Sequence, residues 1–258
     1  MVKKIALTFL LVLGTAALAF PAETVTFQGT QKKGTGEPIL LSGKLTKPEG
    51  SGPFPAVVLL HNCGGISGRQ FPYWLDKFKR WGFVSLQVDS LASRGMANVC
   101  EDDQQATRIM SDQITDAFDA KSYLTRVSFV DPRRIAIIGW GWGGFAALST
   151  LYEEGNPPFQ AAVCFYPGCM RSFKNINAPL LILTGELDPF NSPDKYKTCM
   201  PREQTEHEVL LKVFPGVHGN FDMEGINITL KWGKITYDPA ATNEAADQIK
   251  AFLGKYVK

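Results

Sequence analysis

The residues best suited to chemistry lie in a glycine-rich stretch near the middle of the chain, Gly139-Trp-Gly-Trp-Gly-Gly144. It follows a run of apolar, β-branched residues at 134–138 and precedes Phe145-Ala-Ala-Leu148, which predicts a sharp turn from a buried strand into a helix. Such a turn is the backbone of the nucleophile elbow, G-x-nucleophile-x-G, which presents a Ser or Cys to an acyl carbon. The central residue here is Gly141, so the chain has the frame for acyl transfer without the nucleophilic side chain.

The same stretch also matches G-x-G-x-x-G through Gly139, Gly141 and Gly144, which is a turn that binds a dinucleotide. That motif needs an acidic residue at the end of the following strand. The next predicted strand, 160–166, is followed by a Pro-Gly pair, and two tryptophans would crowd a pyrophosphate. We therefore prefer the elbow. The dinucleotide turn and a tight turn with no chemical role remain as alternatives.

Two residues further along the chain could serve such an elbow. Asp188 follows the apolar run 180–184, and His218 lies in a predicted glycine-containing loop, 215–222. The chain order elbow, Asp, His is the order of the catalytic residues in α/β-hydrolases. In such a triad the carboxylate orients the imidazole, which acts as the general base. We therefore predict that Asp188 and His218 are the partners of the position held by Gly141. The alternatives are a turn-forming Asp and an exposed loop His.

The elements that must position these residues alternate along the chain. Strands are predicted over 24–27, 39–46, 56–60, 83–88, 134–138, 160–166, 180–184 and 208–214, and helices over 71–81, 105–126, 145–151, 193–200 and 239–256. Strands that alternate with helices are typical of a mainly parallel sheet with helices on both faces. The sequence therefore predicts an α/β protein with the α/β-hydrolase fold.

The first 19 residues have the features of an export signal. Lys3 and Lys4 precede an apolar run at 5–18, and Ala17-Leu-Ala19 offers small residues where a signal peptidase reads. The apolar run is short for a membrane span, so a membrane-anchored form is the weaker alternative. We expect a signal peptide over 1–19 and one domain over 20–258, in the periplasm or secreted.

Charge and histidine content narrow the possible partners. Without Lys3 and Lys4, the 27 Lys and Arg of the chain become 25, against 25 Asp and Glu (27 − 2 = 25). A neutral domain has no global field to recruit nucleic acid or an anionic membrane. The three histidines are dispersed and show no Cys–His spacing typical of a metal site. We therefore expect no cofactor and no nucleic-acid partner, and the oligomeric state stays open.

Six segments in this order resemble the dienelactone hydrolase family, above all its exported bacterial members. The segments are His61-Asn-Cys-Gly-Gly65, Val88-Asp-Ser-Leu-Ala-Ser-Arg-Gly95, Ile138-Gly-Trp-Gly-Trp-Gly-Gly144, Phe165-Tyr-Pro-Gly-Cys169, Gly185-Glu-Leu-Asp188 and Pro215-Gly-Val-His218. The resemblance covers nearly the whole mature chain. It implies hydrolysis of esters or lactones by a Cys or Ser at the elbow, assisted by Asp and His.

Position by position, the resemblance gives two of the three catalytic roles a matching residue. Asp188 and His218 match the family's Asp and His, whereas the nucleophile falls on Gly141. The oxyanion would be bound by the backbone N–H groups of Trp142 and Cys63. The family usually has glycine after the first His of the oxyanion loop, where this chain has Asn62.

We therefore expect a dienelactone hydrolase-like hydrolase of small ester or lactone substrates whose activity is weak or absent. No acyl-enzyme can form without a nucleophile, so residual catalysis would depend on the oxyanion hole and on a water activated by His218. The alternative is a catalytically inactive relative that binds an acyl or lactone-like ligand or a protein partner.

The cysteines predict two disulfide bonds, Cys63–Cys100 and Cys169–Cys199, because each pair follows strands expected to be neighbours, and they leave Cys164 as a buried thiol. Four cysteines permit three pairings, so other connectivities stay open.

We predict that the mature protein begins near Phe20. Titration of the denatured, non-reduced protein should return one thiol per chain, and five free thiols would contradict the bridges.

Overall fold

The computed structural model describes residues 22–32, 34, 36–170, 175–200, 206–231 and 233–258. The expected signal peptide, 1–19, lies outside the described residues. Within the described ranges, no helix combines the length and the apolar character needed to cross a membrane.

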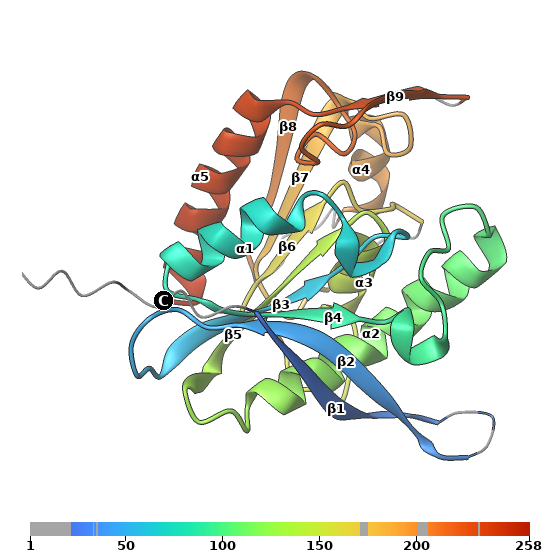
Figure 1. Cartoon of the computed structure of the whole chain (residues 1–258). Helices are drawn as coiled ribbons and strands as arrows, with labels where there is room; N and C mark the ends of the chain where they lie inside the picture. The colour runs from blue at the N-terminus through green and yellow to red at the C-terminus, as the bar shows by residue number, and fades with distance from the viewer. Residues whose placement is uncertain (1–21, 33, 35, 171–174, 201–205, 232) are drawn as a thin grey trace, which may run out of the picture.

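An eight-stranded sheet runs through the centre of the molecule in the order β1-β2-β4-β3-β5-β6-β7-β8 (Figure 1). β2 pairs antiparallel with β1 and β4, and every other neighbouring pair in this sheet is parallel. The strands are β1 (Glu23–Lys32), β2 (Pro38–Thr46), β3 (Phe54–Leu60), β4 (Val84–Asp89), β5 (Val130–Trp140), β6 (Ala162–Phe165), β7 (Leu180–Leu187) and β8 (Val209–His218). The mainly parallel sheet predicted from the sequence is confirmed.

Helices cover both faces of this sheet (Figure 1). Their bounds are α1 (Phe71–Arg80), α2 (Asp103–Leu124), α3 (Trp142–Thr150), α4 (Pro193–Cys199) and α5 (Pro239–Tyr256), with short 3-10 helices η1 (Gly65–Ser67) and η2 (Ala92–Arg94). α1 and α5 pack on one face, whereas α2, α3 and α4 pack on the other.

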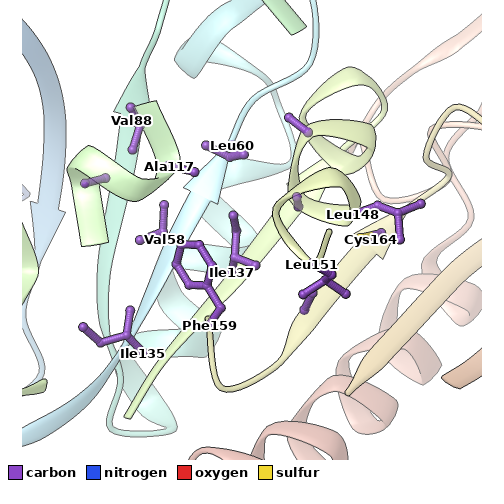
Figure 2. Packing of buried hydrophobic residues seen from close by; sticks show 14 of the residues in the cluster. Val58, Leu60, Val88, Ala117, Ile135, Ile137, Leu148, Leu151, Phe159 and Cys164 are labelled. Carbon is purple, nitrogen blue, oxygen red and sulfur yellow. The ribbon is translucent and has the colours of Figure 1, made fainter. Parts of the chain in front are cut away.

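The central strand β3 shows why the parallel strands of this sheet have apolar residues at consecutive positions. Val58 and Leu60 point to the core beneath α2 and α3, whereas Val57 and Leu59 point to the core beneath α1 and α5. Figure 2 shows the first of these cores, where Val58 and Leu60 lie near Ile137 of β5. A parallel strand covered on both faces must be apolar at every position.

Local signals set several helix ends where the sequence predicts them. Asp238 accepts a hydrogen bond from the N–H of Ala241 (2.9 Å), and Pro239 occupies the first position of α5, so the predicted bounds of this helix are confirmed. Asp102 caps α2 in the same way through the N–H of Gln105 (2.9 Å).

Two parts of the C-terminal region differ from the prediction. β8 continues through the expected loop to His218, because β7 runs on to Leu187 and pairs with it after a shift in register between Gly185 and Leu187. His218 therefore ends a strand rather than lying in a loop. A small hairpin, β9 (Asn227–Leu230) with β10 (Gly233–Thr236), was not predicted because its short, mixed sequence has no clear alternation.

Both cysteine pairs expected from the sequence are bonded in the structure. Cys63–Cys100 joins the segment after β3 to the segment before α2, and Cys169–Cys199 joins the segment after β6 to the end of α4. Cys164 is a free, buried thiol in β6, and burial raises its pKa far above the ordinary value. Each bridge therefore ties a segment that follows a parallel strand to a helix or helix entry.

The turn between β5 and α3 leaves no room for side chains at two of its glycines. A Cβ on Gly139 would collide with the carbonyl of Gly143, and a Cβ on Gly143 would collide with the carbonyls of Leu60 and His61. These glycines let the start of α3 rest directly on the ends of β3 and β5. Close backbone packing, and not flexibility, explains the glycine-rich motif.

We predict opposite effects of the same substitution at two helical glycines. Gly143→Ala should lower the free energy of unfolding by about 3 kcal/mol or more, because backbone atoms cannot move aside. Gly254→Ala should raise it by up to about 1 kcal/mol, since that exposed position in α5 meets no atom and alanine favours the helix. Chemical denaturation of both variants tests this, and a Gly143→Ala protein as stable as the parent would contradict the close packing.

Candidate active site

Gly141 has a strained backbone conformation, which is expected of the central residue of an elbow. Its φ of 55° and ψ of −108° lie where residues with a Cβ are rare. A Cβ built on Gly141 would meet, apart from its chain neighbours, one described atom within 4 Å, the Cβ of Asn62 at 3.6 Å. The backbone at Gly141 is thus compatible with the predicted elbow, and a Cβ there would meet only an ordinary contact.

The two expected oxyanion donors lie against one small cluster of side chains. Cys63 and Trp142 both pack on the cluster formed by Leu91, Val99, Ala106 and Ile109. The backbone N–H groups of Cys63 and Trp142 donate no hydrogen bond to any residue in the described part of the chain. The Cys63 carbonyl is held by the N–H of Val99 (3.0 Å). Both N–H groups are thus free to bind a ligand oxygen.

The ring of His61 holds the oxyanion loop in place. It is fully buried, its Nδ1 lies 2.6 Å from the Asn62 carbonyl, and its Nε2 accepts a hydrogen bond from the N–H of Ser90 (3.2 Å). Burial lowers the His61 pKa, so the ring is neutral, with its proton on Nδ1. The Gln113 amide donates to the His61 carbonyl (2.9 Å). His61 therefore has a structural role.

Asp188 and His218 lie at the ends of paired strands but do not bond to each other. Asp188 is buried, and its Oδ1 accepts the N–H groups of Phe190 (2.8 Å) and Asn191 (2.9 Å). Burial raises the pKa of Asp188, and these two hydrogen bonds oppose the shift. The Nδ1 of His218 lies 3.3 Å from the Leu187 carbonyl. Across the described ranges no hydrogen bond joins the two side chains, so their catalytic pairing stays a prediction.

The Asp188 carboxylate nevertheless lies beside the backbone that follows His218. A Cβ built on Gly219 would come within 2.9 Å of Asp188 Oδ2. That His218 also reaches the elbow at Gly141 remains a prediction.

The sequence reading missed the most strongly bonded carboxylate near the elbow, Asp222. This residue is 1 % exposed, and its Oδ2 accepts the indole N–H groups of Trp74 and Trp140, both at 2.7 Å. Its Oδ1 accepts the hydroxyl of Tyr166, also at 2.7 Å. Burial raises the pKa of Asp222 above its ordinary value, and the three donors oppose that shift.

These bonds connect the segment after His218 to both sides of the elbow. Trp140 directly precedes Gly141, and Tyr166 follows β6 with a φ of 37°. Burial and the nearby Asp222 raise the Tyr166 pKa far above its usual value, so the hydroxyl remains the donor. The Tyr166 carbonyl in turn accepts the side-chain amide of Asn191 (3.2 Å), next to Asp188. A buried Trp or Tyr needs a hydrogen-bond partner, which is the signal that could have identified Asp222.

Three exposed apolar side chains lie on segments that follow β6 or end β7. Met170 is 60 % exposed, Leu187 48 % and Phe190 41 %. Leu187 pairs with His218, and Phe190 donates its N–H to Asp188. The surface beside Asp188 and His218 is therefore partly apolar.

A cavity of about 550 Å³ lies elsewhere, along the C-terminal half of α2 and the start of β5. Its lining includes Phe118, Lys121 and Pro132 and contains none of the expected site residues. Lys121 donates there to the carbonyls of Pro157 (2.8 Å) and Pro158 (2.6 Å). The candidate site is therefore the elbow, where Gly141 has its strained backbone and the N–H groups of Cys63 and Trp142 have no described partner.

We predict that Asp222→Asn destabilises the protein through its aromatic donors. One oxygen would become an NH2 group that faces an N–H or O–H donor, and each unsatisfied buried donor costs about 1–3 kcal/mol. The free energy of unfolding should therefore fall by at least about 2 kcal/mol, as measured by denaturant titration. Asp247→Asn, the same change on the exposed face of α5, is the control and should leave stability unchanged. Equal stability of the two variants would contradict the anchoring role.

Known proteins match both the sequence and the fold. The chain is 30% identical over 136 residues to Esterase FrsA of Shigella boydii serotype 18, which covers 51% of this chain and 29% of that protein. It is 24% identical over 146 residues to Lipase 1 of Moraxella sp. strain TA144, covering 57% and 42%. The chain thus spans less than half the length of these curated relatives.

Solved structures show the same fold at low sequence identity. A dienelactone hydrolase-like promiscuous phosphotriesterase, P91, from metagenomic libraries aligns with a TM-score of 0.69 at 20% identity, over 92% of this chain and 99% of that chain. A dienelactone hydrolase from Anabaena variabilis aligns with a TM-score of 0.63 at 17% identity, over 92% and 99%. The model of the dienelactone hydrolase family matches residues 41–257. With this match over most of the chain and the α/β-hydrolase fold, the chain belongs to the dienelactone hydrolase family.

Proposed function

We propose that this protein binds small esters or lactones at the elbow and hydrolyses them weakly or not at all. The observation that carries the proposal is Gly141, which has the backbone angles of a nucleophile and no side chain. The free N–H groups of Cys63 and Trp142 support binding of the ester carbonyl, since they donate to no other described residue.

The covalent route is closed, because among the described residues no thiol or hydroxyl outside the chain neighbours lies within 4 Å of the position that a Cβ on Gly141 would take. Cys63 borders the elbow but is bonded to Cys100, and Asn62, the nearest side chain to the open space, is not nucleophilic. Hydrolysis would then depend on a water activated by His218. Enzymes that lose a triad member retain on the order of 10³–10⁴-fold acceleration over water, compared with about 10⁶-fold or more for typical enzymes.

The second candidate is a catalytically inactive relative that binds an acyl or lactone-like ligand or a protein partner. One observation favours it. The Asp188 carboxylate accepts N–H groups of its own loop, and His218 contacts a backbone carbonyl instead of Asp188. An imidazole without its orienting carboxylate is a poor general base.

The relatives support the ester class of ligand, because those that match are named as an esterase and a lipase. The two disulfide bonds support export to the periplasm or the medium, since such bonds persist in oxidising compartments. We further propose that residues 20–258 act as one domain.

We predict that Gly141→Ser creates ester hydrolysis and lowers stability. The Oγ would enter the open space beside Asn62 and could form an acyl-enzyme. The positive φ should cost about 1–3 kcal/mol for any residue with a Cβ. Turnover of p-nitrophenyl esters and the denaturant midpoint are the two measurements. Gly141→Ala is the matched control: it should lose the same stability and show no gain in turnover.

A second substitution separates the two candidates. Adding His218→Ala to the Gly141→Ser protein should abolish the new activity if His218 is the general base. If Gly141→Ser folds and stays as inactive as Gly141→Ala, the remaining residues no longer form a catalytic site. The inactive-relative proposal would then replace the hydrolase.

A further inference from the structure

Asn62 borders the space that Gly141 leaves open. Its Cβ lies 3.6 Å from the position that a Cβ of residue 141 would take. A nucleophile at that position would project next to the Cβ of Asn62. The side chain that residue 141 lacks and the side chain of Asn62 therefore border the same space.

The carboxamide of Asn62 has a defined orientation. Its Oδ1 accepts the N–H of Gly64 (2.9 Å), and its backbone carbonyl accepts the N–H of Gly65 (3.2 Å) and lies 2.6 Å from His61 Nδ1. A short side-chain bond to the backbone two residues on is a turn that fixes the side chain. Asn62 Nδ2 donates to no described residue, and it is not buried away from solvent. It is therefore an accessible donor.

We infer that Asn62 is the ligand-recognition residue of this elbow, and that its Nδ2 binds a carboxylate together with the N–H groups of Cys63 and Trp142. This inference rests on the proposed function, because it places the ligand at the same elbow. The acceptor Oδ1 is already used by Gly64, so the free groups of this set are donors. Donors alone bind an ester carbonyl or a carboxylate, and hydrogen bonds to the charged acceptor are the stronger kind.

The apolar surface beside Asp188 and His218 indicates what the carboxylate carries, because these residues are the proposed partners of the elbow. Met170, Leu187 and Phe190 are exposed on the segments next to Asp188 and His218. An apolar chain or ring on the ligand would cover them. The ligand class is therefore a monocarboxylate with an apolar substituent, which is also the acid released from an ester.

The test is a binding titration of the mature, oxidised protein with hexanoate and, separately, with ethyl hexanoate. Asn62→Asp keeps an oxygen for Gly64 but replaces the free donor with a negative charge. We expect hexanoate to bind the Asn62→Asp protein at least about tenfold more weakly than the parent, with much less change for the neutral ester. The hexanoate-induced shift of the Trp142 amide resonance should disappear with it.

Asn98→Asp is the matched control. Asn98 also bonds the backbone two residues on, at Cys100 (2.7 Å), and it is exposed. It should leave hexanoate binding unchanged. Asn62→Gly, which removes the donor without adding charge, should weaken hexanoate by about tenfold. Thermal melts would establish that each variant is folded.

The outcomes separate the inference from the proposed function. If the parent binds both ligands and Asn62→Asp binds hexanoate as well as the parent does, Asn62 does not recognise the carboxylate, while the ester site stands. If the parent binds the ester but not hexanoate, the assigned ligand class is wrong. If the parent binds neither ligand, the proposed function fails, and the inference fails with it.

Discussion

The carboxylate of Asp222 is the interaction on which the site most depends. A buried carboxylate is costly unless it is fully hydrogen-bonded, and here Trp74, Trp140 and Tyr166 supply three short bonds from three different segments. Because these donors come from α1, the end of β5 and the residue after β6, satisfying one charge also sets their relative positions. The segment that follows His218 is thereby held against the strand that leads into Gly141.

Steric packing at the elbow adds a second constraint that does not involve charge. The start of α3 approaches the ends of β3 and β5 so closely that Gly139 and Gly143 cannot carry side chains. The Cys63–Cys100 bridge and the buried ring of His61 fix the facing loop. These constraints hold the backbone donors in place whether or not residue 141 carries a nucleophile.

Gly141 and Asn62 give this chain a different site from the one its family membership implies. At position 141 the backbone has a positive φ. This conformation costs glycine less free energy than it would cost a residue with a Cβ. The Cβ of Asn62 borders the space where a hydroxyl or thiol would lie. We propose that such a site binds an acyl ligand reversibly and does not capture it covalently.

The sequence by itself determined the family and the mainly parallel sheet. These depend on apolar runs, glycine spacing and motif order, which are local properties of the chain. It also determined the bounds of α5, through the Asp238 cap. Only the tertiary structure decided that Asp222 bonds to Trp140, and that His218 ends β8 without bonding to Asp188. It also placed Asn62 beside Gly141. Such contacts join residues distant in sequence, and packing rather than local pattern selects them.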